Sequence, residues 1–195
     1  MKKAEVVEII EPKAIFTGDA NAPVTIMEFG DYESEECAKA NEVVKELLER
    51  YPGKIKFIFR HFPLLKYHQK AHKAAEAAIA AGQEGKFWEM HQAIFKYRRN
   101  LGVTSLKLYA REAGVTSKKL LDELINGMYG WQVQGDLMDG KKMGVTSIPT
   151  FFINGTEFEQ APNYKNLSAY IDGLLKTKKT KTKSLAIPLE VKRSA

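Results

Sequence analysis

The stretch Phe29-Gly30-Asp31-Tyr32-Glu33-Ser34-Glu35-Glu36-Cys37 decides the fold of this chain, because an apolar run ends there and a helical pattern begins. Residues 24–29 are rich in β-branched and aromatic side chains, which predicts a buried strand. Ser34 is a favourable helix N-cap, and the two glutamates after it suit the positive end of a helix dipole. Apolar residues then recur at three- and four-residue steps, as on the inner face of an amphipathic helix: Cys37, Ala40, Val44, Leu47, Leu48 and Tyr51. The stretch therefore predicts strand, sharp turn and helix, with the only cysteine one turn inside the helix.

Length and composition predict one domain, or one domain with an insertion. The chain has 195 residues, of which 44% are hydrophobic, enough for a sizeable core. The formal charge is +6, but much of it lies in residues 176–183, which contain almost no apolar residue and are predicted to form a solvated tail. Because the remainder is near neutral, we predict no nucleic-acid partner. No apolar run approaches the ~20 residues that cross a bilayer, so we predict no membrane span.

The N-terminus and the cysteine content bear on the cellular compartment. The apolar run at residues 6–10 is too short and too acidic for a signal-peptide core. One cysteine excludes an intrachain disulfide and suits a reducing compartment. As written, the chain is predicted to be cytoplasmic, whereas removal of a leader would imply a periplasmic or exported protein. The sequence does not indicate an oligomeric state.

The order of the predicted elements gives two halves separated by helices. A second core strand at 55–62 follows the Cys37 helix, which makes a βαβ unit with parallel strands. Asn154-Gly155 is a strong hairpin signal, so residues 151–153 and 156–159 should pair before a closing helix at 164–175. Helices are expected between the halves at 70–81, from 87 to about 100, after Ser105, after Ser117, and at 129–142. The predicted organisation is an arm at 1–18 with an edge strand at 6–10, an α/β domain at 19–65 and 143–176, a helical insertion at 66–142, and a basic tail at 177–195.

Pro149 stands immediately before a strongly β-prone run. Proline is usually tolerated there only at the start of a strand, and a cis bond is one of the few uses of such a position. The position therefore indicates the start of a strand at Pro149, and it leaves open whether the bond between Ile148 and Pro149 is cis.

Several segments together resemble the DsbA-like members of the thioredoxin superfamily, over roughly residues 19–175. They are Ala22-Pro23-Val24-Thr25, Glu28-Phe29-Gly30-Asp31-Tyr32, Arg60-His61-Phe62-Pro63-Leu64, Gly85-Lys86-Phe87-Trp88-Glu89-Met90-His91 and Gly144-Val145-Thr146-Ser147-Ile148-Pro149-Thr150-Phe151. The resemblance implies a thioredoxin fold, βαβ plus ββα, with an all-helical insertion between the halves. It also implies thiol-disulfide oxidoreductase chemistry at a Cys-x-x-Cys pair that faces the cis-proline.

In this chain that pair would fall on Ser34-Glu35-Glu36-Cys37. The first cysteine of such a pair attacks the substrate disulfide, and the second resolves the mixed disulfide. Ser34 cannot form a sulfur–sulfur bond, so a two-cysteine cycle within one chain is excluded. Helix amides lower the pKa of the Cys37 thiol, whereas neighbouring glutamates and burial raise it. We expect the raising effects to dominate and Cys37 to be a protonated, sluggish thiol.

Three functional hypotheses remain open. The first is a thiol-disulfide oxidoreductase or isomerase relative with a degenerate centre, in which Cys37 acts alone and glutathione or a partner protein supplies the second sulfur. The second is a non-catalytic module that binds extended peptides through the backbone of Ile148 beside the cis-proline. The third is a glutathione-dependent transferase or isomerase in which Ser34 hydrogen-bonds the glutathione thiolate. The alternative is that both residues have purely structural roles, with Ser34 only an N-cap and Cys37 only a small buried residue.

The candidate site residues follow from these hypotheses. They are Cys37 and Ser34 as catalytic residues, Ser147, Ile148 and Pro149 for substrate binding, and Tyr32, Glu35 and Glu36 as residues lining the site. We predict no metal, because no cysteine or carboxylate near His68 and His72 completes a ligand set. His61 is expected at the surface and His91 in a satisfied, half-buried position, while Trp131 and Met143 are expected in the core or lining a groove.

Overall fold

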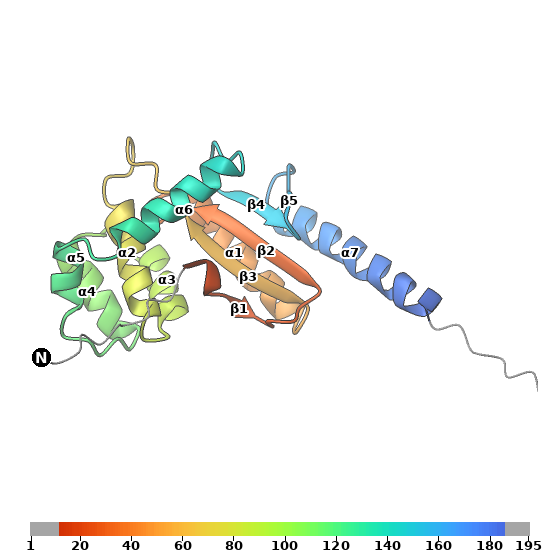
Figure 1. The fold of residues 1–195 in the computed structure, drawn as a ribbon, viewed down its shortest axis with the longest axis horizontal. Coiled ribbons are helices and arrows are strands. Elements are labelled where there is room, and N and C mark those ends of the chain that lie inside the picture. Colours follow the sequence, from red (N-terminus) through yellow and green to blue (C-terminus); the bar gives the residue numbers. More distant parts are fainter. Residues whose placement is uncertain (1–11, 186–195) are drawn as a thin grey trace, which may run out of the picture.

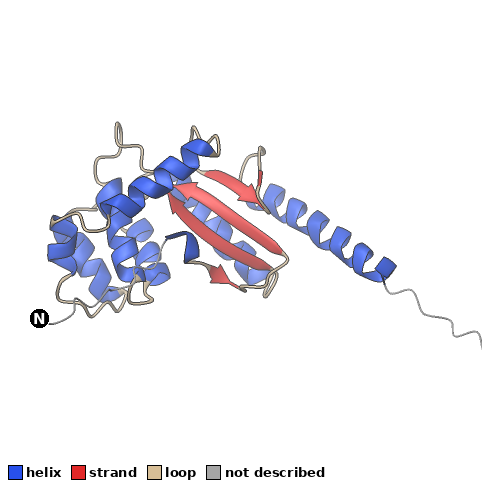
Figure 2. Cartoon of the chain, viewed as in Figure 1, coloured by secondary structure: helices blue, strands red, loops and turns tan. Residues whose placement is uncertain are grey.

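A five-stranded sheet forms the centre of the protein in a computed structural model that describes residues 12–185, with side chains from 12 to 177 except that of residue 121 (Figures 1 and 2). The strand order is β1-β3-β2-β4-β5. The strands are β1 (Thr17–Gly18), β2 (Val24–Gly30), β3 (Ile55–His61), β4 (Thr150–Ile153) and β5 (Thr156–Glu157). The edge strand predicted at residues 6–10 lies outside the described residues.

The predicted βαβ unit is confirmed. β2 and β3 pair in parallel, from Val24 opposite Ile55 to Gly30 opposite His61. Helix α1 (Glu35–Arg50) connects them and buries Cys37, Ala40, Val44 and Leu47 on one side. The last three residues of both strands are buried, so the carboxyl ends of the strands lie inside the protein beneath the turn that leads to α1.

The second half begins with a cis peptide bond between Ile148 and Pro149, as predicted. β4 pairs antiparallel with β2 and, through a turn at Asn154-Gly155, with β5. Both turn residues have positive φ, 51° and 83°, which matches the right-handed twist of a two-residue hairpin. The hairpin is confirmed, although β5 ends at Glu157 and not at residue 159.

Five helices lie between the halves. They are α2 (Ala71–Gly82), α3 (Phe87–Lys96), α4 (Val103–Glu112), α5 (Leu120–Ile125) and α6 (Gly130–Lys142). Figure 1 shows α4 and α5 at the end of the molecule away from β4, whereas α6 returns to the sheet and packs against β3. The prediction that a helix begins after Ser105 was wrong, because the extended backbone of Gly102 serves as the N-cap and Val103 is already helical.

The closing helix α7 (Tyr164–Leu185) is longer than the predicted 164–175. Lysine has a high helix propensity, so the basic run continues the helix although it has no apolar face. Figure 1 shows the C-terminal part of α7 extending beyond the sheet.

Two side chains predicted in the core or lining a groove are substantially exposed. Trp131 on α6 is 55% exposed but lines a hollow with Arg60 and Asp136, as predicted, whereas Met143 is 37% exposed. Residues 12–185 contain no helix that is both long enough and apolar enough to cross a membrane.

Candidate functional site

Ser34 is the N-cap of α1, as predicted. Its backbone is extended, and its hydroxyl oxygen accepts a hydrogen bond from the Cys37 amide at 3.2 Å. The same hydroxyl donates to Glu36 Oε2 at 3.4 Å. Only 3% of Ser34 is exposed, so the hydroxyl is occupied and largely shielded from solvent.

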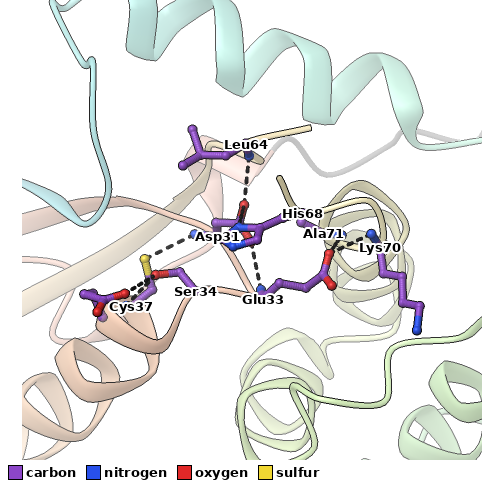
Figure 3. Close-up of polar contacts among 9 residues, drawn as sticks. Asp31, Glu33, Ser34, Cys37, Leu64, His68, Lys70 and Ala71 are labelled. Carbon is purple, nitrogen blue, oxygen red and sulfur yellow. Dashed lines mark hydrogen bonds and ion pairs between the residues drawn. The ribbon is translucent and has the colours of Figure 1, made fainter. Parts of the chain in front are cut away.

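Asp31 ties the turn before α1 to the loop between β3 and α2 (Figure 3). Its side chain is buried and accepts hydrogen bonds from the Glu33 amide at 2.8 Å and the Leu64 amide at 2.8 Å. His68 Nδ1 lies 2.9 Å from Asp31 Oδ2. A carboxylate with several donors holds its neighbours strongly, so Asp31 fixes the position of both segments.

Glu33 makes a second link between the turn before α1 and the segment that leads into α2. Its Oε2 accepts hydrogen bonds from the amides of Lys70 at 2.7 Å and Ala71 at 2.8 Å (Figure 3). These amides lie at the start of α2, whose N-cap Lys70 provides no side-chain cap of its own. A carboxylate there also interacts favourably with the helix dipole. Neither role was predicted from the sequence, although two acids directly after a buried strand are a detectable signal.

Cys37 is completely buried, and its Sγ accepts a weak hydrogen bond from the Asp31 amide at 3.4 Å. Burial raises the pKa of the Cys37 thiol well above its usual range, and the nearby Glu28 carboxyl raises it further. Hydrogen bonds from Ser34 and Asp31 act in the opposite direction and are outweighed. The thiol is therefore protonated in neutral solution.

Glu28 is a buried carboxyl group inside β2, with 1% of its surface exposed. Burial raises the pKa of Glu28 from 4.5 to about 8, so the group is mostly neutral at pH 7. Within the described residues its Oε1 has no hydrogen-bond partner. Glu28 was not predicted as a site residue, although one acid inside an otherwise apolar strand was a usable signal.

Tyr32, predicted to line the site, is buried in the core. Its hydroxyl lies 3.0 Å from His91 Nδ1, and His91 Nε2 lies 3.0 Å from Asn41 Oδ1. Because Asn41 Oδ1 can only accept, we assign the proton to Nε2, which leaves Nδ1 to accept from Tyr32. Burial lowers the pKa of His91 to about 3, so the ring is neutral.

His61 was expected at the surface, and that expectation was wrong, because only 1% of the residue is exposed. Its amide and its Nδ1 both lie within hydrogen-bond distance of Asp136 Oδ2, at 3.0 Å and 2.8 Å. Arg60 donates to the other oxygen of Asp136. Asp136 belongs to α6, so no local pattern in the sequence indicated this partner.

The two other histidines each face a carboxylate of their own. His68 pairs with Asp31, and His72 Nδ1 lies 3.1 Å from Glu76 Oε1. The loop fold brings Asp31 to His68, a partner that the spacing of the two histidines did not indicate. The described part of the chain holds no group of three or more residues able to bind a metal ion.

The segment before β4 lies beside the same turn. Thr150 pairs with Phe29 in the sheet, so Pro149 lies about level with Gly30, just before Asp31. Ser147 and Thr150 are joined by a hydrogen bond of 2.7 Å from the threonine hydroxyl to the serine carbonyl. The side chain of Ile148 packs against the buried cluster that contains Cys37. Within residues 12–185, no hydrogen bond engages the backbone of Ile148.

We predict that Cys37 will not react with a soluble thiol reagent in the native protein. A protonated and fully buried thiol has neither the thiolate nor the access that reaction requires. Reaction with Ellman's reagent at pH 8 should be at least about a hundred-fold slower than for an unfolded chain, in which the thiol pKa is near 8.5. The control is the same protein in guanidinium chloride, and a fast stoichiometric reaction of the native protein would contradict the prediction.

Comparison with known proteins agrees with this geometry. A family model described as thioredoxin matches residues 11–173, so the chain belongs to the thioredoxin family. The chain also shares its fold with DsbA-like proteins of known structure. It is similar to BdbD from Bacillus subtilis, with a TM-score of 0.76 and 23% identity over 85% of this chain and 93% of that one. It is also similar to the thiol-disulfide exchange protein alpha-DsbA2 from Wolbachia pipientis, with a TM-score of 0.69 and 25% identity over 82% and 86% of the two chains.

Curated relatives match over a smaller part of their own length. The chain is 34% identical over 154 residues to the Na(+)/H(+) antiporter NhaA 1 of Salinispora arenicola, which is 79% of this chain and 24% of that protein. A second relative, Na(+)/H(+) antiporter NhaA 1 of Mycobacterium sp. (strain KMS), is 31% identical over 71% of this chain and 23% of that protein. The chain thus spans about a quarter of the length of these relatives.

Proposed function

We propose that this DsbA-like protein binds extended polypeptide segments beside Pro149 and carries out no dithiol exchange. The centre Ser34-Glu35-Glu36-Cys37 lacks the first sulfur. The remaining thiol is buried and protonated, so it is poorly placed for chemistry with a partner. The arrangement retains the surface beside Pro149, which can bind an extended peptide without a reactive thiol.

The observation that carries the proposal is the unpaired backbone of Ile148 next to the turn. An extended peptide could pair with its amide and carbonyl groups, as in β-strand addition. Exposed apolar side chains nearby would contact the side chains of such a peptide. They are Leu65 and Tyr67 in the loop held by Asp31, and Met143 five residues before Ile148.

The two chemical alternatives have less support. Single-cysteine chemistry through Cys37 would require the turn to open, because no surface of the residue reaches solvent. Binding of a glutathione thiolate by Ser34 would have to displace existing hydrogen bonds to Cys37 and Glu36. It would also place a negative charge among the neighbouring glutamates, which is unfavourable. We therefore place peptide binding ahead of both.

Amide hydrogen exchange tests the proposal directly. When the full chain is saturated with an extended apolar peptide, exchange at Ile148 should slow at least about ten-fold, because the amide becomes hydrogen-bonded. Exchange at the exposed amide of Lys118, which lies in the helical insertion, should not change. A peptide with the same side chains but N-methylated backbone cannot pair and should bind much more weakly. Equal binding of the two peptides, or unchanged exchange at Ile148, would refute strand addition.

A further inference from the structure

A groove of about 520 Å³ lies between α1 and α3 and begins at the first residue of α1, beside Ser34. One face of α1 lines one wall, through Glu35, Ala38, Lys39, Glu42 and Lys45, and the opposite wall consists of Gln92, Phe95, Lys96 and Arg98. A second hollow of about 340 Å³ shares Phe95, Lys96 and Arg98 with the first and continues to Arg99 and Tyr109. The two hollows therefore adjoin each other and together make up the groove.

The groove is basic. Five cationic side chains line it against two carboxylates, namely Lys39, Lys45, Lys96, Arg98 and Arg99 against Glu35 and Glu42. Four of the cations already pair with acids, Lys39 and Arg98 with Glu35, Lys45 with Glu42 and Lys96 with Glu112. The side chains in these pairs are exposed except that of Arg98, which is 21% exposed. Exposed pairs contribute little to stability, so a ligand carboxylate can replace such a partner. Arg99 is exposed and forms no ion pair within residues 12–177.

The walls of the groove are held in place before any ligand arrives. Asn41 and Gln92 exchange side-chain hydrogen bonds of 3.0 Å and 3.1 Å, which join α1 to α3. The ring of Tyr97 stacks on Tyr109 at 4.6 Å, and the Tyr109 hydroxyl donates to the Asn100 carbonyl at 2.9 Å. The segment that carries Arg98 and Arg99 is thus fixed on both sides, and a bound partner would lose less free energy in ordering it.

We infer that this basic groove binds an acidic segment of the polypeptide that occupies the Ile148 edge, an inference that rests on the proposed function. From Glu35 to Lys45 the helix rises about 15 Å, at about 1.5 Å per residue. An extended chain advances about 3.3 Å per residue, so the groove fits about four or five residues. The apolar surfaces of Ala38 and Phe95 in the lining suit a peptide backbone and its methylenes better than a small inorganic anion. The partner is therefore a protein with an apolar extended stretch next to a run of Asp or Glu.

The test compares two fluorescent peptides that share an apolar extended half and differ in the other half, which carries either glutamates or glutamines. At an ionic strength of ~0.02 M, anisotropy titration of the full chain should show about ten-fold tighter binding of the glutamate peptide. At ~0.3 M the difference should shrink, because salt screens exposed charges. The variant Lys96→Glu/Arg99→Glu should lose the preference. The control Lys118→Glu/Lys119→Glu, which changes the net charge equally at exposed positions outside the groove, should keep it.

Each outcome is decisive. Equal binding of the two peptides to the unchanged chain would overturn the inference that the groove binds an acidic segment, and it would leave the proposed peptide binding intact. If both variants lose the preference for the glutamate peptide equally, the effect is due to net charge, and the inference that the groove binds an acidic segment is also overturned. Failure of both peptides to bind would refute the proposed function itself. Thermal unfolding of the two variants at similar temperatures would show that the comparison is between folded proteins.

Discussion

The Ser34→Cys variant is expected to form a disulfide with Cys37 and to gain disulfide-exchange activity that the unchanged chain lacks. Residue 34 is the N-cap and its side chain already reaches the Cys37 amide at 3.2 Å. Positions three apart at a helix start have Cα atoms within the separation of about 4.4–6.8 Å that a disulfide requires. The new thiol would sit at the end of α1 where amides and dipole favour a thiolate, although Glu35 and Glu36 would oppose its ionisation.

Insulin reduction with dithiothreitol as the electron donor measures this gain, and the mass of the oxidised variant should be lower by two hydrogens. Ser34→Cys/Cys37→Ala is the matched control and should form no intrachain disulfide. Ser34→Ala tests the structural role alone and should cost about 1 kcal/mol through loss of the cap. If a folded Ser34→Cys protein cannot be oxidised by glutathione disulfide, replacing the serine oxygen with sulfur is not sufficient to restore an active centre.

The second large effect is expected from Glu28→Gln, which should stabilise the protein increasingly as the pH rises. The pKa of Glu28 is raised from 4.5 to about 8 by burial. Between these values the folded chain holds a proton that the unfolded chain has released, so this group reduces the free energy of unfolding by about 1.4 kcal/mol per pH unit. Glutamine keeps the shape and carries no such proton. The variant should match the unchanged chain near pH 4 and exceed its free energy of unfolding by about 3 kcal/mol or more above pH 8.

The measurement is urea unfolding of both proteins from pH 4 to pH 9, and the difference between them is the informative quantity. His91 must be considered because burial lowers its pKa from 6.5 to about 3. Its contribution is present above pH 6.5 and is lost as the pH falls toward 3, which is the opposite sign to that of Glu28. In the unchanged chain the two slopes offset each other between about pH 4.5 and 6.5, whereas the Glu28→Gln variant keeps only the slope of His91, so the His91 contribution cancels in the difference between the two proteins. A difference between Glu28→Gln and the unchanged chain that stays constant with pH would contradict the assignment.

The features that sequence reasoning recovered depend on neighbours in the chain. The β2–α1 junction, the Ser34 cap and the Asn154-Gly155 hairpin each follow from a few adjacent residues, and the cis bond at Pro149 follows from the family resemblance. The expected basic tail was the exception, since the high helix propensity of lysine extends α7 to Leu185.

The features that were missed depend on partners far apart in sequence. His68 meets Asp31 across 37 positions, and His61 meets Asp136 across 75. Neither pair has a spacing that a helix or a strand would impose, so only the assembled fold brings them together. Glu28 differs, because its position inside an apolar strand was visible, but the extent of its burial depends on the helices that cover the sheet.

The two carboxylates of the turn have a consequence for how the molecule is assembled. Glu33 supplies the cap that α2 lacks, Asp31 holds the loop before it, and Asp136 of α6 satisfies buried donors on β3. The turn that follows β2 therefore supplies the hydrogen bonds at the start of the helical insertion, and the insertion in turn supplies the carboxylate of Asp136 to β3. Neither part is a self-sufficient module that could be cut out or grafted, and loss of structure in one should propagate to the other as a single cooperative transition.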